Sequence, residues 1–331
     1  MTPRLPAGRT ARLYLRLSLS SAILIWPALA AGWAGAGGPW LILGIGLVCT
    51  GLAARAVPRP VLCRRWDACL QIAALLLLIA FEIRLAGQMT AAAFLPGARP
   101  GAIGLAVTLA AFFLSGRGLR ALIPLNDLLL PISLAALAGL LLPALTLGGM
   151  DRLTPVPDPV RVREATIPAM VTLFFAPLGQ AVGRRFLGYA PPVGRRVRSL
   201  RSGGFFALGL GAAAFACAGV FGPVHLASLR WPLLELARAA FFSWNVFERA
   251  DLIFLLAWLP GSFVIAALAL THLRRDLARL VPRWISPLAA AVASAGSWCL
   301  AQTPPRAWAW LLVIGGFLTL ALLLTPGGER G

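Results

Sequence analysis

The sequence contains no lysine, and all 30 of its basic residues are arginine. Acidic residues are also few, only 11, so the formal net charge is +19. A strongly basic surface is typical of nucleic-acid-binding domains, but these arginines lie in short segments between apolar runs rather than on one soluble domain. The absence of lysine is more typical of a codon bias toward arginine than of a mechanism. The charge therefore gives no support to a nucleic-acid partner.

Residues that bind metals or form disulfides are scarce as well. The chain has two histidines, His225 and His272, and five cysteines without CxxC spacing. This pattern predicts neither a metal site nor a disulfide framework. HExxH, GxSxG and P-loop motifs are absent, and no His/Asp pair falls within an apolar segment. We therefore expect a protein that is not an enzyme and that uses no cofactor.

Apolar residues, in contrast, make up 59% of the chain, and the mean hydropathy is +0.83. One water-soluble core cannot bury this fraction, whereas a bilayer core takes roughly 20 apolar residues per helix. The sequence predicts an all-α polytopic membrane protein with a single integral membrane domain over residues 1–331. Its ten predicted helices are 17–34, 39–54, 68–95, 102–116, 125–147, 165–182, 203–222, 250–271, 284–301 and 307–325. The sequence GAGGP at 35–39 predicts a tight turn between the first two.

Arginine distribution predicts the orientation. With the N-terminus inside, 21 arginines lie on the cytoplasmic side, 8 outside and one, Arg84, within a helix. The positive-inside rule then predicts that both termini are cytoplasmic, residues 1–16 and 326–331 included. An alternative for the N-terminal region is a secretory signal peptide cut near PALAAGWAGA, but a second apolar segment follows at once and favours an uncleaved helix. The amphipathic stretch after Pro232, in the outer connection 227–249, is predicted to lie in the membrane interface.

An odd number of helices in each half makes the two halves run in opposite directions. Residues 17–147 and 165–325 are therefore predicted to form a 5+5 inverted repeat. Pro27 in helix 1 and Pro177 in helix 6 fall near the middle of their segments. Since proline removes an N–H donor and clashes with the preceding turn, we expect both helices to be broken near mid-membrane. Ordinary proline kinks are the alternative.

Charged residues within apolar segments are candidate functional residues because they are costly in a bilayer. Glu82 and Arg84 are two residues apart on helix 3, which separates them by about 200° and prevents a pair between them. Each is expected to find a partner on another helix or in a polar cavity, or to extend to the outer interface. Asp127, at the start of helix 5, is a candidate either for capping that helix or for ion coupling.

Three charges, Glu248, Arg249 and Asp251, stand directly before the apolar run of helix 8. Glu248 and Asp251 are spaced i, i+3 at the outer beginning of the helix, which predicts an N-terminal cap with an interface anchor. A second hypothesis is that the three charges form a latch between the external helix and the core.

The stretch FxERADLIFLLAWLPGSFVIAALAL resembles helix 8 of the endospore germination permeases, the B subunits of germinant receptors. In that family an E-R-x-E/D group precedes an aromatic-rich apolar helix with a tryptophan. Residues 95–134, 151–160 and 231–242 fit the family in the same order. The chain departs from the family at the start of helix 5, where Ile123, Pro124 and Asp127 replace a basic residue and a glutamate, and in using arginine where many relatives use lysine.

The resemblance implies the ten-helix inverted-repeat core of the amino acid, polyamine and cation transporter superfamily. It also implies a small-molecule site between broken helices 1 and 6 and a multi-pass location in the spore inner membrane. A germinant receptor A subunit and a lipoprotein C subunit would be the partners.

On this basis we expect a nutrient-sensing subunit that triggers spore germination when it binds a small molecule, such as an amino acid. An ion-coupled secondary amino acid transporter, coupled through Glu82, Asp127 or Asp251, is the alternative, and a scaffold for partner subunits is a third possibility. Freed backbone groups would hold the ligand, and the aromatic side chains would either line its pocket or serve in ordinary packing. The predicted ligand-binding residues are Trp26, Pro27, Ala28, Gly32, Thr172, Phe174, Phe175, Pro177 and Gly179.

Overall fold

A computed structural model describes most of the chain, and the structural statements below concern those residues. They are residues 12, 15–16, 21–55, 65–95, 97–149, 192–242, 250–282, 286–303, 310–311 and 313–318. Within these ranges the secondary structure is helical, and no strand occurs. The predicted all-α class is confirmed in the part of the chain that can be described. Every predicted segment except 165–182 contains helix there.

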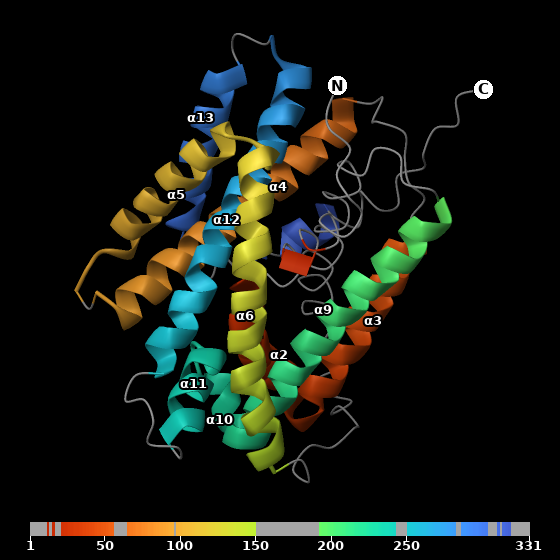
Figure 1. Ribbon diagram of the computed structural model, residues 1–331, viewed down its shortest axis with the longest axis vertical. Helices are drawn as coiled ribbons and strands as arrows, with labels where there is room; N and C mark the ends of the chain where they lie inside the picture. The colour runs from red at the N-terminus through yellow and green to blue at the C-terminus, as the bar shows by residue number, and fades with distance from the viewer. Residues whose placement is uncertain are drawn as a thin grey trace.

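The helices form one elongated bundle (Figure 1). Two of them, α10 and α11, lie together at one end of the bundle, and α6 runs along much of its length. In chain order the elements are η1 (Ser21–Leu24), α2 (Trp26–Ala34), η2 (Gly35–Gly37), α3 (Gly38–Arg55), α4 (Arg65–Ala93), α5 (Pro100–Gly116), α6 (Leu119–Leu147), α9 (Pro192–Phe221), α10 (Pro223–Ser228), α11 (Pro232–Phe242), α12 (Ala250–Leu280) and α13 (Ser286–Ala301).

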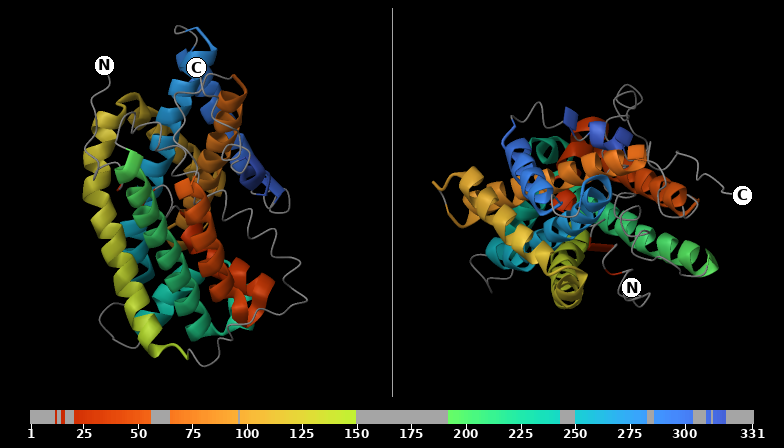
Figure 2. Two further views of the ribbon diagram at one scale, coloured as in Figure 1. Left: turned by 90° about the vertical axis from the view of Figure 1, so that its right-hand side faces the viewer. Right: turned by 90° about the horizontal axis from the view of Figure 1, so that it is seen from above.

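The described helices associate in two groups. In the first, α3 packs along α9, and α2 packs on α3, α9 and α10. In the second, α4 packs on α5, α12 and α13. Helix α6 contacts both α9 and α12 and so joins the groups. The views in Figure 2 show the α3–α9 pair set apart from the α4–α5–α12–α13 group at one end of the bundle.

Small residues allow close approach within both groups, as in other membrane helix bundles. Gly46 on α3 lies against Ala207 on α9, where an added Cβ would come within 3.1 Å of the Ala207 Cβ. In the second group Gly87 on α4 faces the carbonyl of Pro100 at the start of α5. Backbone contact replaces side-chain contact at these points, which explains how short apolar helices pack with little space between them.

Helix 1 is discontinuous, as its proline predicts. A short 3₁₀ helix, Ser21–Leu24, is followed by a turn at Ile25 and then by the regular helix Trp26–Ala34. Pro27 lies in the first turn of α2, where a missing N–H breaks no helical bond and the fixed φ suits the helix. The break therefore lies on the N-terminal side of Pro27.

The predicted tight turn after helix 1 is also present. Gly35 has a φ of +55°, which L side chains rarely adopt. Beyond it, Gly38 lies so close to α2 that a Cβ there would be 2.7 Å from the carbonyl oxygen of Ala30. The chain thus reverses direction at GAGGP and begins α3.

Several helices extend beyond their predicted ends. The predicted helix 125–147 begins at Leu119, and the predicted helix 250–271 continues to Leu280. The apolar pattern marks only the part of a helix inside the bilayer, whereas backbone bonding continues until a breaker such as Pro282. Pro124, Pro131 and Pro143 lie inside α6 without ending it.

Length and composition suit a membrane-spanning protein. The stretches Ala68–Ala93, Leu119–Thr146 and Asp251–Ala278 are each apolar and long enough to cross a bilayer, and Trp26–Val48 reaches that length across the turn at Gly35. Helices Pro100–Gly116, Ala207–Phe221 and Pro287–Ala301 are apolar but shorter. Large apolar side chains such as Phe113, Leu256 and Val48 are exposed on the outside of the bundle, as expected for side chains that face lipid.

Candidate functional site

Arg16 lies inside the bundle. Its exposed fraction is 3%, although it precedes the first apolar run and is counted with the cytoplasmic arginines in the orientation argument. It contacts α6 and α12 near their middles, at Ser133 and Gly261. The polar partners around the guanidinium make this burial possible. The assignment of residues 1–16 to a cytoplasmic segment stays a prediction.

Two of these partners come from α6. Arg16 Nε donates to Asn126 Oδ1 over 3.2 Å, and Arg16 Nη1 donates to Ser133 Oγ over 2.9 Å. The two α6 residues are seven apart, so both point to the same face of that helix. Ser133 Oγ in turn lies 2.8 Å from the carbonyl oxygen of Ala257 on α12, to which it can donate. One guanidinium therefore links the N-terminal part of the chain to α6 and, through Ser133, to α12.

Glu82 on α4 supplies the opposite charge. It is completely buried, and its carboxylate attracts the Arg16 guanidinium electrostatically. Burying a single charge is costly, but a pair of opposite charges with hydrogen-bond partners reduces that cost. Glu82 therefore interacts electrostatically with a residue outside its own helix, in keeping with one of the possibilities left open by its sequence position.

A pocket adjoins this cluster between α6 and α12. Arg16, Ser133, Trp258, Gly261 and Ser262 are among the residues that line it, and the space within it is about 250 Å³, including the part open to solvent. Gly261 allows the close approach of Arg16, because a Cβ at this position would displace the end of the Arg16 side chain. The α12 backbone thus forms one wall against the guanidinium.

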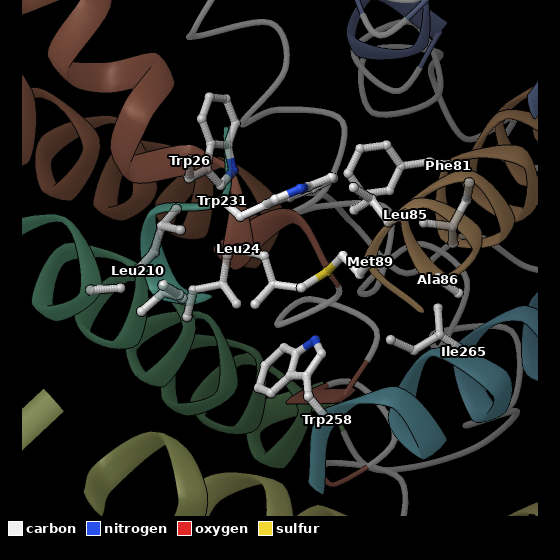
Figure 3. Close-up of a cluster of buried hydrophobic side chains, with 14 of the residues drawn as sticks. Leu24, Trp26, Phe81, Leu85, Ala86, Met89, Leu210, Trp231, Trp258 and Ile265 are labelled. Atoms are coloured by element: carbon white, nitrogen blue, oxygen red, sulfur yellow. The ribbon is translucent and has the colours of Figure 1, made fainter. Parts of the chain in front are cut away.

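Aromatic and aliphatic side chains surround the break in helix 1 on the apolar side of this region. Figure 3 shows Leu24 of η1 between Trp26, Trp231, Met89 and Trp258. All five residues are at least 92% buried, since the most exposed of them, Trp231, is 8% exposed. Trp258 belongs to both this cluster and the pocket wall, so the polar and apolar regions share a boundary.

The predicted ligand residues of helix 1 lie in and around this cluster. Trp26, Pro27 and Ala28 are buried, whereas Gly32 is exposed and faces only Ala227 of α10. Residues 28–32 are regular α-helix, so the irregular backbone available to a ligand is at 21–25 instead. Trp26 Nε1 is buried and has no hydrogen-bond acceptor in the described part of the chain.

The predicted helix-6 residues, Thr172, Phe174, Phe175, Pro177 and Gly179, lie outside the described residues, as do Glu248 and Arg249 of the proposed latch. Their roles stay predictions.

Arg84 has a different partner from Glu82. Its Nη1 donates to the carbonyl oxygens of Ala301, over 2.9 Å, and of Thr303. These carbonyls lie at the end of α13, where an arginine side chain can satisfy acceptors that the helix leaves free. The two charges of helix 3 thus contact different neighbours, in agreement with their angular separation.

Asp127 is the ninth residue of α6, because that helix begins at Leu119. The capping alternative is therefore wrong: the helix has already completed two turns at this point. Asp127 Oδ1 instead pairs with Arg12 Nε over 2.9 Å. This ion pair and the Arg16 contacts fasten the N-terminal helix to α6 at two levels.

Asp251 lies in the first turn of α12, as the sequence predicts. Its side chain is only 3% exposed, and its Oδ2 pairs with Arg238 Nε of α11 over 3.1 Å. Arg238 also pairs with Glu235, three residues earlier on the same helix. A charged link between α11 and α12 therefore exists, with Arg238 as a partner that the sequence did not suggest.

Arg16, Asn126 and Ser133 are the site residues that the sequence analysis missed. Arg16 precedes the apolar run and reads as an ordinary flanking arginine, while Asn126 and Ser133 are common polar residues within a long helix. The seven-residue spacing of Asn126 and Ser133 was the available signal, since it aligns two polar side chains on one face of an apolar helix. No group of three metal-ligating side chains occurs among the described residues.

The fold was compared with known proteins. The crystal structure of MhsT in complex with L-phenylalanine superposes with a TM-score of 0.68 at 15% sequence identity, covering 96% of this chain and 88% of that one. The substrate-bound, outward-open structure of a Na⁺-coupled sialic acid symporter superposes with a TM-score of 0.63 at 13% identity, covering 97% and 79%.

This chain has the LeuT-type transporter fold. The fold class expected from the sequence, a polytopic membrane protein of the 5+5 inverted-repeat type, is therefore confirmed. The two structural neighbours are transporters rather than enzymes. No protein-family model and no curated protein matches the sequence, so membership of the germination permeases stays a prediction.

Proposed function

We propose that the protein is an ion-coupled secondary transporter of a small solute with an apolar side group, such as an amino acid. The observation that carries the proposal is the break in helix 1, which lies beside buried polar and aromatic side chains at the centre of the bundle. In transporters of inverted-repeat design, such breaks expose backbone groups to a solute at the bilayer midplane.

The chemistry of the surroundings supports this class of solute. Arg16, Asn126 and Ser133 offer polar groups on one side, and Trp26, Trp231 and Trp258 offer apolar surface on the other side. A small amphipathic molecule needs both kinds of contact, because a few polar groups fix its orientation while apolar surface supplies burial.

The arrangement of the helices is consistent with movement around that point. The group containing α2, α3 and α9 and the group containing α4, α5, α12 and α13 are packing units joined by α6 and α11. Alternating access in such folds arises when one group rocks against the other around a fixed site. The helix-1 break lies where these groups meet, since η1 contacts α11 and α2 while Arg16 reaches α6 and α12.

Uptake by purified protein in liposomes tests the proposal. We expect radiolabelled L-phenylalanine, used as the first test solute, to accumulate when an inward gradient of Na⁺ or H⁺ is imposed, and not when the gradient is collapsed by an ionophore. A panel of other labelled amino acids extends the test. Absence of flux for every solute under both gradients would refute transport.

A matched pair of variants tests the site. Trp26→Phe removes the buried Nε1 at the break, and Trp40→Phe alters an exposed tryptophan on α3 that contacts Phe215. If Trp26 bonds the solute, its loss should weaken apparent affinity by about fivefold, corresponding to roughly 1 kcal/mol. The Trp40 variant should transport as the wild type does, and equal loss in both variants would contradict the assignment.

A nutrient-sensing subunit of a spore germinant receptor is the second candidate. It is favoured by the charged residues Glu248, Arg249 and Asp251, which carry the sequence resemblance. Among them, Asp251 of α12 pairs with Arg238 of α11. This candidate includes the spore inner membrane, cytoplasmic termini, and A and C subunits as partners.

Binding without flux distinguishes the sensor from the transporter. A sensing subunit should bind its nutrient in detergent solution but should not accumulate it in liposomes. Neighbouring genes for a membrane protein with large cytoplasmic domains and for a lipoprotein would support the sensor. Accumulation by this chain alone would favour the transporter.

A further inference from the structure

We propose that Arg16 and Asn126 form a binding site for a small anion in the core of the bundle. The anion would be either a free inorganic ion or the carboxylate of the transported solute, and the second case rests on the proposed transport function. The two residues come from parts of the chain 110 residues apart, Arg16 before the first apolar run and Asn126 in the third turn of α6.

Two buried hydrogen-bond donors carry this inference. Arg16 Nη2 and Asn126 Nδ2 are both inaccessible to solvent, and neither has an acceptor in the part of the chain that the structure describes. The two residues are 3% and 0% exposed. Burying a donor without an acceptor costs about 1–3 kcal/mol, and more for a charged group. The side chains that carry these two donors are hydrogen-bonded to each other. We therefore infer that both donors bind one acceptor in another state of the protein.

The chemistry of the missing partner follows from the existing bonds. Asn126 Oδ1 already accepts from Arg16 Nε, so the amide nitrogen is the free end of that side chain. A guanidinium and an amide N–H₂ can only donate. The complementary ligand is an acceptor, and a negative charge strengthens both bonds. A metal cation or an ammonium group is excluded at this point because both would face donors and a positive charge.

Glu82 limits the charge that the site can hold. Its buried carboxylate attracts Arg16, and when both groups are ionised their charges sum to zero before an anion binds. A monovalent anion leaves one net negative charge, whereas a divalent anion would leave two in a medium of low dielectric. The site is therefore suited to a monovalent anion, and removal of the Glu82 charge should strengthen binding.

The site is closed in the described state. The pocket between α6 and α12 is lined by Arg16, Ser133 and Gly261 but not by Asn126, and both free donors, Arg16 Nη2 and Asn126 Nδ2, are inaccessible to solvent. Arg16 is held on one side only by the backbone of Gly261, and its other contacts are to side chains. An anion gains access when Arg16 moves relative to α6 and α12, as happens when the bundle opens to one side of the membrane.

The first experiment measures thermal unfolding of the purified protein in chloride-free buffer. Sodium chloride and sodium acetate are titrated, with sodium isethionate, a larger anion, as the control at matched ionic strength. At about 100 times the dissociation constant we expect the apparent Tm to rise by about 5 °C with chloride or acetate. Isethionate should give no such rise.

Four variants assign the effect to the site. Arg16→Gln should weaken anion binding about tenfold or more, because it removes a charged donor. Asn126→Asp keeps the acceptor for Arg16 Nε but replaces the free donor with an oxygen, and it should abolish binding even if Arg16→Gln fails to fold. Glu82→Gln should tighten binding. Arg120→Gln, which alters an exposed arginine in the first turn of α6, is the matched control and should bind as the wild type does.

The second experiment tests the solute carboxylate. L-phenylalanine and L-phenylalaninamide, which lacks the carboxylate, are compared by Tm shift and by competition with labelled phenylalanine uptake. If the carboxylate occupies the site, only the acid should act on the wild type, and Asn126→Asp should lose that preference. If a free inorganic ion occupies the site instead, chloride should stabilise the wild-type protein. Uptake by Asn126→Asp should then still favour L-phenylalanine over L-phenylalaninamide.

The outcomes separate this inference from the transport proposal. Normal uptake with wild-type affinity in Arg16→Gln and Asn126→Asp, together with no chloride or acetate shift, overturns the anion site and leaves transport intact. A chloride shift that Asn126→Asp abolishes, in a protein that transports nothing, supports the inorganic anion site and removes transport. An anion shift that is equal in all four variants also overturns the site.

Discussion

Replacing Gly87 with alanine should destabilise the contact between α4 and α5. An added Cβ at Gly87 would lie 2.6 Å from the carbonyl oxygen of Pro100 and 3.3 Å from the backbone nitrogen of Gly104. Both are backbone atoms, and they belong to the first turns of α5, which Pro100 begins. Relief therefore requires the two helices to separate, since no flexible side chain can move aside.

The magnitude follows from two opposing effects. Overpacking of this kind costs about 1–3 kcal/mol. Alanine is favoured over glycine within a helix by roughly 0.5–1 kcal/mol, which offsets part of that cost. We therefore expect a net loss of about 1–2 kcal/mol. For a chain of this length the apparent Tm should fall by about 2–4 °C.

Thermal unfolding monitored by tryptophan fluorescence in detergent measures this change. Gly139→Ala on α6 is the matched control, because an added Cβ at Gly139 meets nothing within 4 Å. The control should have an unchanged or slightly higher Tm. If Gly87→Ala is as stable as Gly139→Ala, the close approach of α4 and α5 is not present in the folded protein, and the packing argument fails.

Three further changes can be measured in the same way. Arg238→Gln breaks the pair with the buried Asp251. Because the Arg238 side chain is 44% exposed, we expect the free energy of unfolding to fall by only about 1 kcal/mol, or roughly 2 °C in Tm. An unchanged Tm would show that the α11–α12 link does not stabilise the protein. Trp298→Phe removes the hydrogen bond from Nε1 to the Gly101 carbonyl oxygen, 3.0 Å away, and should lower the free energy of unfolding by about 1 kcal/mol. Trp310→Phe, the control at a 66% exposed position, should leave it unchanged. Equal effects of the two variants would contradict a stabilising role for this hydrogen bond. Arg12→Gln breaks the ion pair with Asp127, whose side chains are 48% and 21% exposed, and should lower the free energy of unfolding by less than about 1 kcal/mol. A fall in Tm well above 2 °C would show that this ion pair is stronger than its exposure implies.

Much of the helical architecture could be predicted because a bilayer imposes simple rules. Long apolar runs must be helical to satisfy their backbone groups, so segments such as 68–95 and 250–271 were identifiable from composition alone. The turn at 35–39 and the break before Pro27 followed from glycine and proline chemistry. Helix ends were predicted less well, as for α6 and α12, because they depend on polar residues outside the hydrocarbon region.

The candidate site was predicted only in part. Trp26 and Glu82 were selected because a large aromatic residue beside a broken helix and a charge within an apolar run are unusual in sequence. Arg16 was not selected, since a flanking arginine looks the same whether it faces water or turns into the core. Arg238 was missed for a related reason: it lies in a connection, and only the folding of α11 over α12 brings it to Asp251.

The sequence by itself determined that the chain is a helical membrane protein with an interrupted first helix, because apolar run length and proline position act locally along the chain. Only the tertiary structure decided which charges meet. Arg16 is separated from Asn126 and Ser133 by 110 and 117 residues, and their contact exists because helix 1 breaks at a level where α6 and α12 present polar groups and Gly261 leaves space. Such contacts depend on the relative positions of whole helices, which no local pattern encodes.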